Sequence, residues 1–346
     1  RSDSVKIAVD AMGGDHAPQA IIAGVIQARD KYPDLEFLLF GQVERLKPLI
    51  SDLTRIKLIQ ADEVIGMNDE PVKAVRQKKA SSLVMAAKAV KAGQADALFS
   101  CGNTGALLAA GLLIVGRIKG ISRPGLLSTL PMISQEQGAF NLLDSGANAE
   151  SKPEHLYQYA VMGKYYAQKV RGIKNPRIGL LNNGTEPHKG SKVTQEAYQL
   201  LQADQEINFV GNVEANAVLK NAADVIVADG FLGNTLLKSI EGTASAIMHL
   251  LKATILASGL SGKLGALLLK PALLKLKSKM NQAKYGGAVL LGVKAPVVKA
   301  HGASDGKTVY YPLVQIRQML EKTTIPDVVA YFSKLATEKK DECEEK

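Results

Sequence analysis

The sequence predicts an α/β protein, a three-layer α/β/α sandwich around a mostly parallel, doubly wound sheet. Short runs rich in β-branched residues alternate along the chain with longer segments of helical periodicity. Six of the strand-like runs end in polar loops that contain glycine. The composition of the 346 residues, 46% hydrophobic and 22% charged, is typical of a globular protein with a large core.

The first predicted unit is a strand, a loop and a helix within residues 5–28, VKIAVDAMGGDHAPQAIIAGVIQA. Apolar residues alternate over 5–9, and after Pro18 they recur at helical spacing. In doubly wound sheets such a strand-to-helix loop faces the crevice where ligands bind. Taken alone, this loop is equally compatible with a tight connection that binds nothing.

The rest of the chain repeats this alternation. Strands are predicted at 35–40, 56–60, 97–100, 140–143, 177–181, 207–210, 225–228 and 297–300, and helices include 72–92, 154–169 and 234–251. No repeat or linker divides the chain, so residues 5–335 are predicted to form one domain. The almost entirely charged residues of 336–346 predict a disordered tail.

A basic segment interrupts the alternation. Between residues 242 and 304 there are nine lysines and no Asp or Glu, so nearly all of the net charge of +10 lies there. Such a segment suits an acidic partner, which could be an anionic membrane, an acidic protein or nucleic acid. Residues 256–280 predict two helices, with Pro271 opening the second, in a helical hairpin at about 243–284.

The apolar and basic residues of this hairpin allow two interpretations. It is either a core or dimer-interface element, or a basic amphipathic element that enters an anionic membrane. The residues assigned to membrane contact are Leu264, Leu267, Leu268, Lys263 and Lys270.

The six loops are predicted to converge at one edge of the sheet and to form a ligand crevice. They contain residues 10–18, 101–105, 144–148, 182–190, 229–234 and 301–305. The chain has no G-x-G-x-x-G, Walker A, H-x-x-x-H, C-x-x-C or G-x-S-x-G pattern, so no nucleotide cofactor or metal is expected. Backbone N–H groups with Asn, Thr, Lys and His suit a site that holds an oxyanion. Cys101 is either a thioester nucleophile or a small apolar loop residue.

Seven motifs resemble one bacterial family. They are VDAMGGDHAP, GNTGALLAAG, LLDSGAN, LLNNGTE, DGFLGN, KYGGAVLLG and KAHGASD, in this order over about residues 5–335. Together they resemble the fatty acyl-ACP:phosphate acyltransferase family called PlsX, where ACP is acyl carrier protein. In that family, position 183 is apolar and the stretch after Glu186 is more charged, so Asn183 and His188 receive no assigned role.

The resemblance implies a reaction and a setting for it. Inorganic phosphate attacks the thioester of long-chain acyl-ACP and gives acyl phosphate, which feeds the first acylation of glycerol 3-phosphate in phospholipid synthesis. The fold would be related to phosphotransacetylases and to isocitrate and isopropylmalate dehydrogenases. The protein would be a homodimer without metal or cofactor, cytoplasmic and peripherally attached to the membrane through the hairpin, and a glycerol-3-phosphate acyltransferase would be a downstream partner.

The loops and one basic helix then supply the predicted site residues. The catalytic set is His16, Asn103, Lys189 and His301, in which a histidine would donate to the thioester oxygen or move a proton on phosphate. The phosphate- and substrate-binding set is Asp10, Gly13, Gly14, Asp15, Gly102, Thr104, Asp144, Gly146, Asn148, Asn182, Gly184, Thr185, Glu186, Asp229, Gly230, Asn234, Ser304 and Asp305. The aspartates are expected to organise the loops, because a carboxylate would repel phosphate. Docking of the acidic carrier protein is assigned to Lys73, Arg76, Lys78 and Lys79 on one predicted helix.

Two rival functions remain at this point. One is a small-acyl phosphotransacylase that uses coenzyme A, and the other is a non-catalytic membrane scaffold. Nucleic-acid binding is disfavoured, because the lysines are interleaved with leucines and only 5% of the residues are aromatic. Two cysteines, far apart in the sequence, predict a reducing cytoplasm rather than a disulfide framework.

Overall fold

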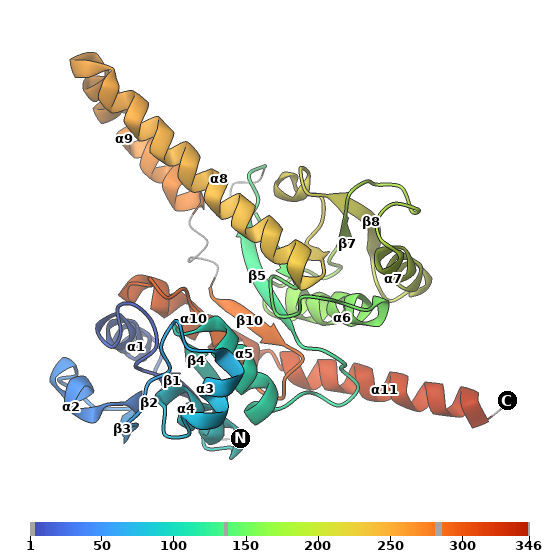
Figure 1. Cartoon of the computed structure of the whole chain (residues 1–346), viewed down its shortest axis with the longest axis horizontal. Helices are drawn as coiled ribbons and strands as arrows, with labels where there is room; N and C mark the ends of the chain where they lie inside the picture. The colour runs from blue at the N-terminus through green and yellow to red at the C-terminus, as the bar shows by residue number, and fades with distance from the viewer. Residues whose placement is uncertain (1–3, 135–137, 281–285, 345–346) are drawn as a thin grey trace.

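The computed structural model describes residues 4–134, 138–280 and 286–344 (Figure 1). Its strands form a single sheet in the order β3-β2-β1-β4-β11-β10-β5-β6-β9-β7-β8. The strands are β1 (Val5–Asp10), β2 (Leu35–Gly41), β3 (Ile56–Gln60), β4 (Ala97–Ser100), β5 (Gly125–Pro131), β6 (Ala139–Leu143), β7 (Ile178–Asn182), β8 (Phe209–Glu214), β9 (Val225–Val227), β10 (Ala288–Leu291) and β11 (Val297–Lys299). All nine strands that the sequence predicts are present.

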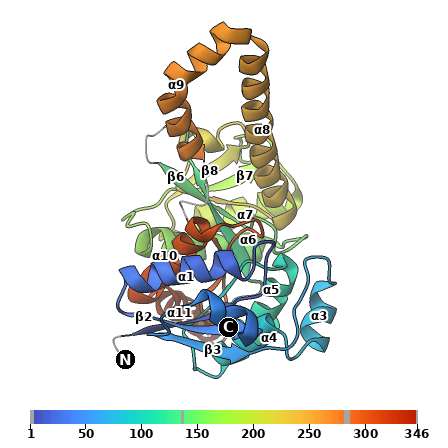
Figure 2. The same ribbon diagram turned by 90° about the vertical axis from the view of Figure 1, so that its left-hand side faces the viewer.

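Helices cover both faces of the sheet, as predicted for a three-layer α/β/α arrangement (Figures 1 and 2). They are α1 (Gln19–Lys31), α2 (Val43–Leu46), α3 (Pro71–Gln77), α4 (Ser82–Lys91), α5 (Thr104–Ala110), α6 (Pro153–Lys169), α7 (Lys192–Ala203), α8 (Gly230–Ala257), α9 (Gly259–Met280), α10 (Gly306–Glu321) and α11 (Thr324–Glu344). In the first half, α1 packs against α10, while α4 packs against β1 and β2. In the second half, α6 packs against β9 and α7.

The middle of the sheet reverses the direction of its strands. β1, β2, β3, β4 and β11 run parallel to one another, and so do β6, β7, β8 and β9. Between these sets, β10 is antiparallel to β11 and to β5, and β5 is antiparallel to β6. The two parallel sets therefore run in opposite directions.

This reversal corrects the prediction that all six loops leave one edge of the sheet. The loops after β1, β4 and β11 leave in one direction, and those after β6, β7 and β9 leave in the other. The sequence analysis missed β5 and β10, which are the strands that cause the reversal. Both are bounded by Gly or Pro, and their apolar runs have no clear alternation.

The register nevertheless brings the two sets of strand ends together. Val298 pairs with Val289, Val289 with Leu127, and Leu127 with Leu143. Leu143 ends β6 and Val298 is the penultimate residue of β11. The two halves are thus staggered, and both sets of carboxyl ends meet in the middle of the sheet.

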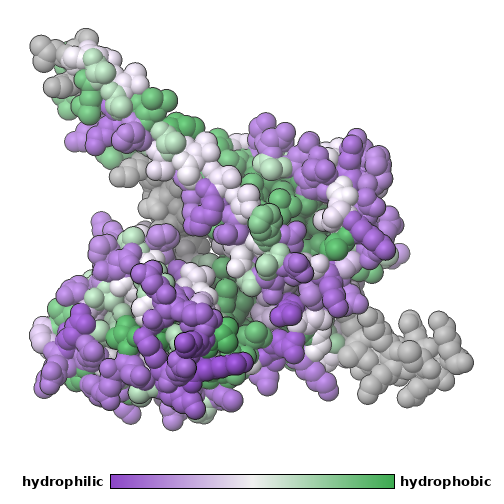
Figure 3. All heavy atoms as spheres, in the orientation of Figure 1, coloured by the Kyte–Doolittle hydropathy of each residue, from purple (hydrophilic) through white to green (hydrophobic). Residues whose placement is uncertain are grey.

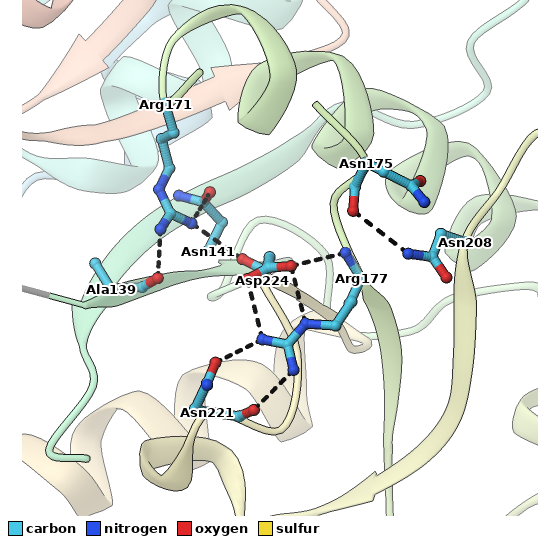
Figure 4. Close-up of polar contacts among 8 residues, drawn as sticks. All are labelled: Ala139, Asn141, Arg171, Asn175, Arg177, Asn208, Asn221 and Asp224. Atoms are coloured by element: carbon cyan, nitrogen blue, oxygen red, sulfur yellow. Dashed lines mark hydrogen bonds and ion pairs between the residues drawn. The ribbon is translucent and has the colours of Figure 1, made fainter. Parts of the chain in front are cut away.

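The opposite ends of the strands in the second half are tied together by two arginines (Figure 4). The Nε and backbone N–H of Arg177 donate to Asp224, at 3.1 and 2.8 Å, and its Nη1 donates to the carbonyl oxygen of Asn221 at 3.0 Å. Arg171 donates to Asn141 Oδ1 at 3.1 Å. These contacts fix the base of β6, β7 and β9 and leave their carboxyl ends to build the loops.

The helical hairpin projects away from the sheet (Figure 2). It consists of α8 and α9, and its turn is at Gly259, whose φ of +67° favours glycine. The predicted bounds of the two helices were wrong. α8 continues to Ala257, because residues 243–257 contain no Gly or Pro to end it. Pro271, which was predicted to open the second helix, lies inside α9. None of the helices in the described ranges is long and apolar enough to span a bilayer.

Two other predicted segments differ in the structure. The helix expected at 72–92 is divided into α3 and α4, because the side chain of Ser81 accepts a hydrogen bond from the Val84 N–H and starts a new helix. The tail predicted to be disordered from residue 336 is helical as far as Glu344. Its Glu and Lys residues are good helix formers, and they continue a helix whose buried residues, such as Phe332, anchor it.

Candidate active site

A cavity of about 390 Å³ lies where loops from both halves of the sheet meet. One side is formed by the end of β11, the loop after it and the start of α5. The other side is formed by β5, the loop after β6 and the first turns of α8. Of the predicted site residues, the cavity is lined by Thr104, Asn234, His301, Ser304 and Asp305.

Asp10 organises the loops after β1 and β4 and does not line the cavity. Its buried carboxylate accepts hydrogen bonds from the hydroxyls of Ser82 and Ser100 at 2.6 and 2.7 Å. Ser100 in turn accepts from the Gly102 N–H at 2.9 Å. Burial raises the pKa of the Asp10 carboxyl, although the serine hydroxyls act in the opposite direction. At Gly13 any side chain would collide with Asp10 and Gly102, so glycine is required there.

The same loop connects to the last one. The Asp15 N–H donates to the carbonyl oxygen of Gly302 at 2.9 Å, and Gly14 has a φ of +110° beside Cys101. The side chains of Asp15 and His16 are exposed. The structure therefore does not bring His16, a predicted catalytic residue, into the cavity lining.

Both polar side-chain atoms of Asn103 form hydrogen bonds within the protein. Its Oδ1 accepts from the Ala106 N–H at 3.0 Å and caps α5, while Nδ2 donates to the carbonyl oxygens of Met67 and Asp69 at 3.1 and 3.0 Å. The side chain is 7% exposed, so little of it remains for a substrate. Asn103 therefore caps α5, whose first residue, Thr104, lines the cavity.

Asp144 has the corresponding role in the second half. Its buried carboxylate accepts from the backbone N–H groups of Leu126, Ala147 and Asn148 at 3.1, 2.7 and 3.0 Å. Burial raises the pKa of this carboxyl, and these hydrogen bonds oppose the rise.

The start of α8 packs directly on this loop. A side chain at Gly230 would collide with Asn148, and one at Gly146 would press on Asn234. Asp229 accepts from the Leu232 N–H at 2.8 Å and caps α8. These residues build the wall of the cavity without lining it, apart from Asn234.

The loop after β7 is separate from the cavity. Asn182 Nδ2 donates to the Lys189 carbonyl oxygen and to Asn212 Oδ1, both at 3.1 Å, so the loop is closed on itself. Thr185 and Glu186 are exposed, and Gly184 packs against the Lys189 side chain. None of these residues lines the cavity, although Lys189 was predicted to be catalytic.

His301 lines the cavity and has one of its ring nitrogens engaged within its own loop. Its Nδ1 accepts from the Ala303 N–H at 3.2 Å, so the neutral ring carries its proton on Nε2. The N–H of buried Ser304 donates to the His301 carbonyl oxygen at 3.0 Å. Asp305 caps α10 by accepting from the Thr308 N–H at 2.8 Å, and this bond holds the pKa of the Asp305 carboxyl below its usual value.

The sequence analysis missed several residues that line the cavity. The hydroxyls of Ser128 and Ser145 lie 2.8 Å apart, and Lys238 forms an ion pair with Glu241 at 2.7 Å. Ser128 was missed because β5 was missed. Lys299 stands at the start of the motif KAHGASD, which was the signal that could have identified it.

The residues assigned to docking are only in part available. Lys73, Arg76 and Lys79 are exposed. Lys78 donates to Asp69 at 2.6 Å and to the Val64 carbonyl oxygen at 3.0 Å, and it lies beyond the end of α3. Its charge is therefore neutralised within the protein.

The hairpin exposes the leucines that were assigned to the membrane. Leu264, Leu267 and Leu268 are 62, 64 and 75% exposed, and Lys270 is exposed beside them. The side chain of Lys263 lies outside the described part of the structure. Figure 3 shows hydrophobic and hydrophilic residues together along this projection.

Comparison with known proteins identifies the family. Residues 5–326 match the model of the family described as "Fatty acid synthesis protein". The chain belongs to this family. It is 67% identical over 329 residues to a phosphate acyltransferase of Ligilactobacillus salivarius, covering 95% of this chain and 99% of that protein. It is 58% identical over 328 residues to the phosphate acyltransferase of Enterococcus faecalis, covering 95% of this chain and 98% of that protein.

Solved structures share the fold of this family member at low identity. A phosphotransacetylase from Streptococcus pyogenes aligns with a TM-score of 0.61 at 16% identity, over 92% of this chain and 95% of that one. A branched-chain phosphotransacylase from Enterococcus faecalis aligns with a TM-score of 0.54 at 20% identity, over 91% of this chain and 99% of that one. The predicted fold class is confirmed.

The loop after β4 contains one candidate nucleophile, Cys101, whose reactivity can be measured. Burial, aided by the negative charge of Asp10, raises the pKa of its thiol to about 12, so the thiolate is scarce at neutral pH. We expect iodoacetamide at about pH 8 to leave Cys101 unmodified in the native protein with Cys343→Ser, and to modify it in urea. Cys101→Ala is expected to retain thioester cleavage. Rapid native alkylation together with an inactive Cys101→Ala variant would contradict this assignment.

Proposed function

We propose that this chain catalyses the transfer of a long-chain acyl group from ACP to inorganic phosphate. The main support is the likeness to phosphate acyltransferases at 67% identity over almost the whole chain. The cavity adds support from chemistry, because it gathers hydroxyl, amide and imidazole groups from both halves of the sheet. Such groups suit an oxyanion and a thioester carbonyl held side by side.

The reaction balances without any further reactant. An oxygen of hydrogen phosphate forms a bond to the thioester carbon, the carbon–sulfur bond breaks, and the proton of hydrogen phosphate ends on the sulfur of the carrier thiol. The products are acyl phosphate and free ACP. In this proposal the Nε2–H of His301 donates to the thioester oxygen as negative charge develops on it.

The cavity residues also have a role before the chemical step. Phosphate in water is a poor nucleophile because it is strongly hydrated. The hydroxyls of Thr104 and Ser304, with the amide of Asn234, replace that hydration on the cavity wall. Residues 5–335 act as one domain in this proposal, because the cavity needs loops from both halves.

A small-acyl phosphotransacylase that uses coenzyme A is the alternative. The shared fold with phosphotransacetylases allows it, but at 16–20% identity that likeness concerns the fold alone. The relatives of much higher identity are named phosphate acyltransferase, which does not favour the alternative. The other rival, a non-catalytic membrane scaffold, would not explain the polar groups that line the cavity.

The first experiment measures free thiol released from palmitoyl-ACP, with and without inorganic phosphate, while hydroxylamine traps acyl phosphate as the hydroxamate. We expect release that requires phosphate and an equal amount of hydroxamate. Palmitoyl-coenzyme A and acetyl-coenzyme A serve as the comparison substrates. Absence of phosphate-dependent release from all three thioesters would contradict the proposed function.

We propose that the acidic carrier protein docks on the exposed cations of α3 and its end. Reversing two charges in Lys73→Glu/Arg76→Glu should raise the KM for acyl-ACP by about tenfold and leave the KM for phosphate unchanged. The matched control is Lys57→Glu, an exposed lysine on β3. Equal KM values for acyl-ACP in all three proteins would place the docking surface elsewhere.

We propose that the hairpin attaches the protein, as a homodimer, to the cytoplasmic face of an anionic membrane. Its exposed leucines and the absence of acidic residues from 242 to 304 support this. A membrane surface also suits an apolar acyl phosphate that a glycerol-3-phosphate acyltransferase would consume next.

Vesicle sedimentation tests the attachment. With phosphatidylglycerol vesicles, Leu267→Ser/Leu268→Ser should bind at least about tenfold more weakly than the wild type, because burial of two leucines is lost. Leu53→Ser/Leu200→Ser, which changes two exposed leucines outside the hairpin, should bind as the wild type does. Unchanged binding of the hairpin variant would exclude these leucines from membrane contact.

A further inference from the structure

Lys299 differs from the other lysine of the cavity in its partners. It is the last residue of β11, and its Nζ donates to the Ala300 carbonyl oxygen at 2.9 Å. Lys238 lines the opposite side of the cavity, on α8, and Glu241 neutralises it at 2.7 Å. Among the residues that the structure describes, no carboxylate forms an ion pair with Lys299.

The position of Lys299 is fixed by the sheet. It pairs with Ser100 at the end of β4 on one side and with Ala288 at the start of β10 on the other. Ser100 is held by Asp10, so the strand that carries Lys299 is anchored to the loop-organising hydrogen bonds. Lys299 therefore stands on a rigid element that lines the cavity, near the middle of the sheet.

The ammonium group has capacity for a further ligand. An ammonium has three N–H donors, and the Ala300 carbonyl oxygen accounts for one. Burial lowers the pKa of Lys299, Lys238 acts in the same direction, and Cys101 and Asp15 oppose it. A partly desolvated cation without a paired anion is unfavourable, and an anion in the cavity would remove that cost.

We propose that Lys299 binds the phosphate co-substrate directly and supplies the positive charge that holds it against the thioester. The inference rests on the proposed function and adds the residue that selects the anionic substrate. Phosphate would lie between Lys299 and the hydroxyls of Thr104 and Ser128, beside the thioester oxygen that accepts from the Nε2–H of His301. With its charge compensated, the dianion approaches the carbonyl carbon without repulsion from Glu241 and Asp15.

Lys189 is the other lysine that the sequence suggested for this role. It belongs to the loop after β7, which is closed on itself and does not line the cavity. The geometry therefore favours Lys299 as the contact for phosphate. A purely structural role for Lys299 would affect both substrates alike, and this difference makes the proposal testable.

The kinetic test compares Lys299→Met and Lys299→Arg with the wild type. In Lys299→Met the KM for phosphate should rise by about tenfold to a hundredfold, while the KM for palmitoyl-ACP stays within about twofold. Lys299→Arg keeps the charge and should recover part of the phosphate affinity. The control is Lys294→Met, which removes an exposed lysine near the opposite end of β11. An unchanged KM for phosphate, or an equal rise in both KM values, would overturn the proposal.

A second measurement needs no turnover. Inorganic phosphate should raise the Tm of the wild type more than potassium chloride does at equal ionic strength, and Lys299→Met should lose this difference. If the wild type shows the shift but cleaves no thioester, the proposed function fails while the assignment of Lys299 stands. If Lys299→Met does not fold, Lys299→Gln replaces it, because the amide retains a donor for Ala300 but no charge. A phosphate shift of wild-type size in the uncharged variant would overturn the assignment.

Discussion

The pairing of β10 with β11 and β5, and of β5 with β6, is the constraint on which the rest of the structure depends. Backbone hydrogen bonds fix this register, and a shift by one residue would turn every side chain to the other face. The three antiparallel pairings reverse the second half of the sheet and stagger it against the first. As a result, strand ends that would otherwise face away from each other border one cavity.

Two buried aspartates convert this backbone arrangement into a defined site. Asp10 accepts hydrogen bonds from the hydroxyls of Ser82 in α4 and Ser100 at the end of β4, and Asp144 accepts from backbone N–H groups in the loop after β6. Both carboxylates are used inside the protein, where their charge does not face the anionic substrate. The hydroxyls, the imidazole of His301 and the ammonium of Lys299 remain to line the cavity. The residues that hold the loops in place are thus different from those that line the cavity.

The sequence was informative wherever local signals decide the structure. β-Branched runs and glycine loops predicted the parallel strands and the presence of a helical hairpin, although not the bounds of its two helices. The direction of the second half could not be predicted, because the apolar runs of β5 and β10 do not alternate clearly and their antiparallel pairing depends on residues distant in the sequence. The same limit applies to side chains. Asn103 has the composition of a phosphate ligand, but only the fold shows that the 66–69 loop and α5 use its amide. Lys299 was not predicted, because its partial burial and the absence of an ion pair with any carboxylate in the described ranges depend on the tertiary structure.

In this mechanism phosphate meets the thioester between the two halves of the sheet. A crystal structure of the full chain with bound inorganic phosphate would locate the anion. We expect phosphate in the cavity, within hydrogen-bond distance of the Lys299 ammonium and the Thr104 hydroxyl. Phosphate held by the loop after β7, around Gly184 and Lys189, with none in the cavity, would contradict it.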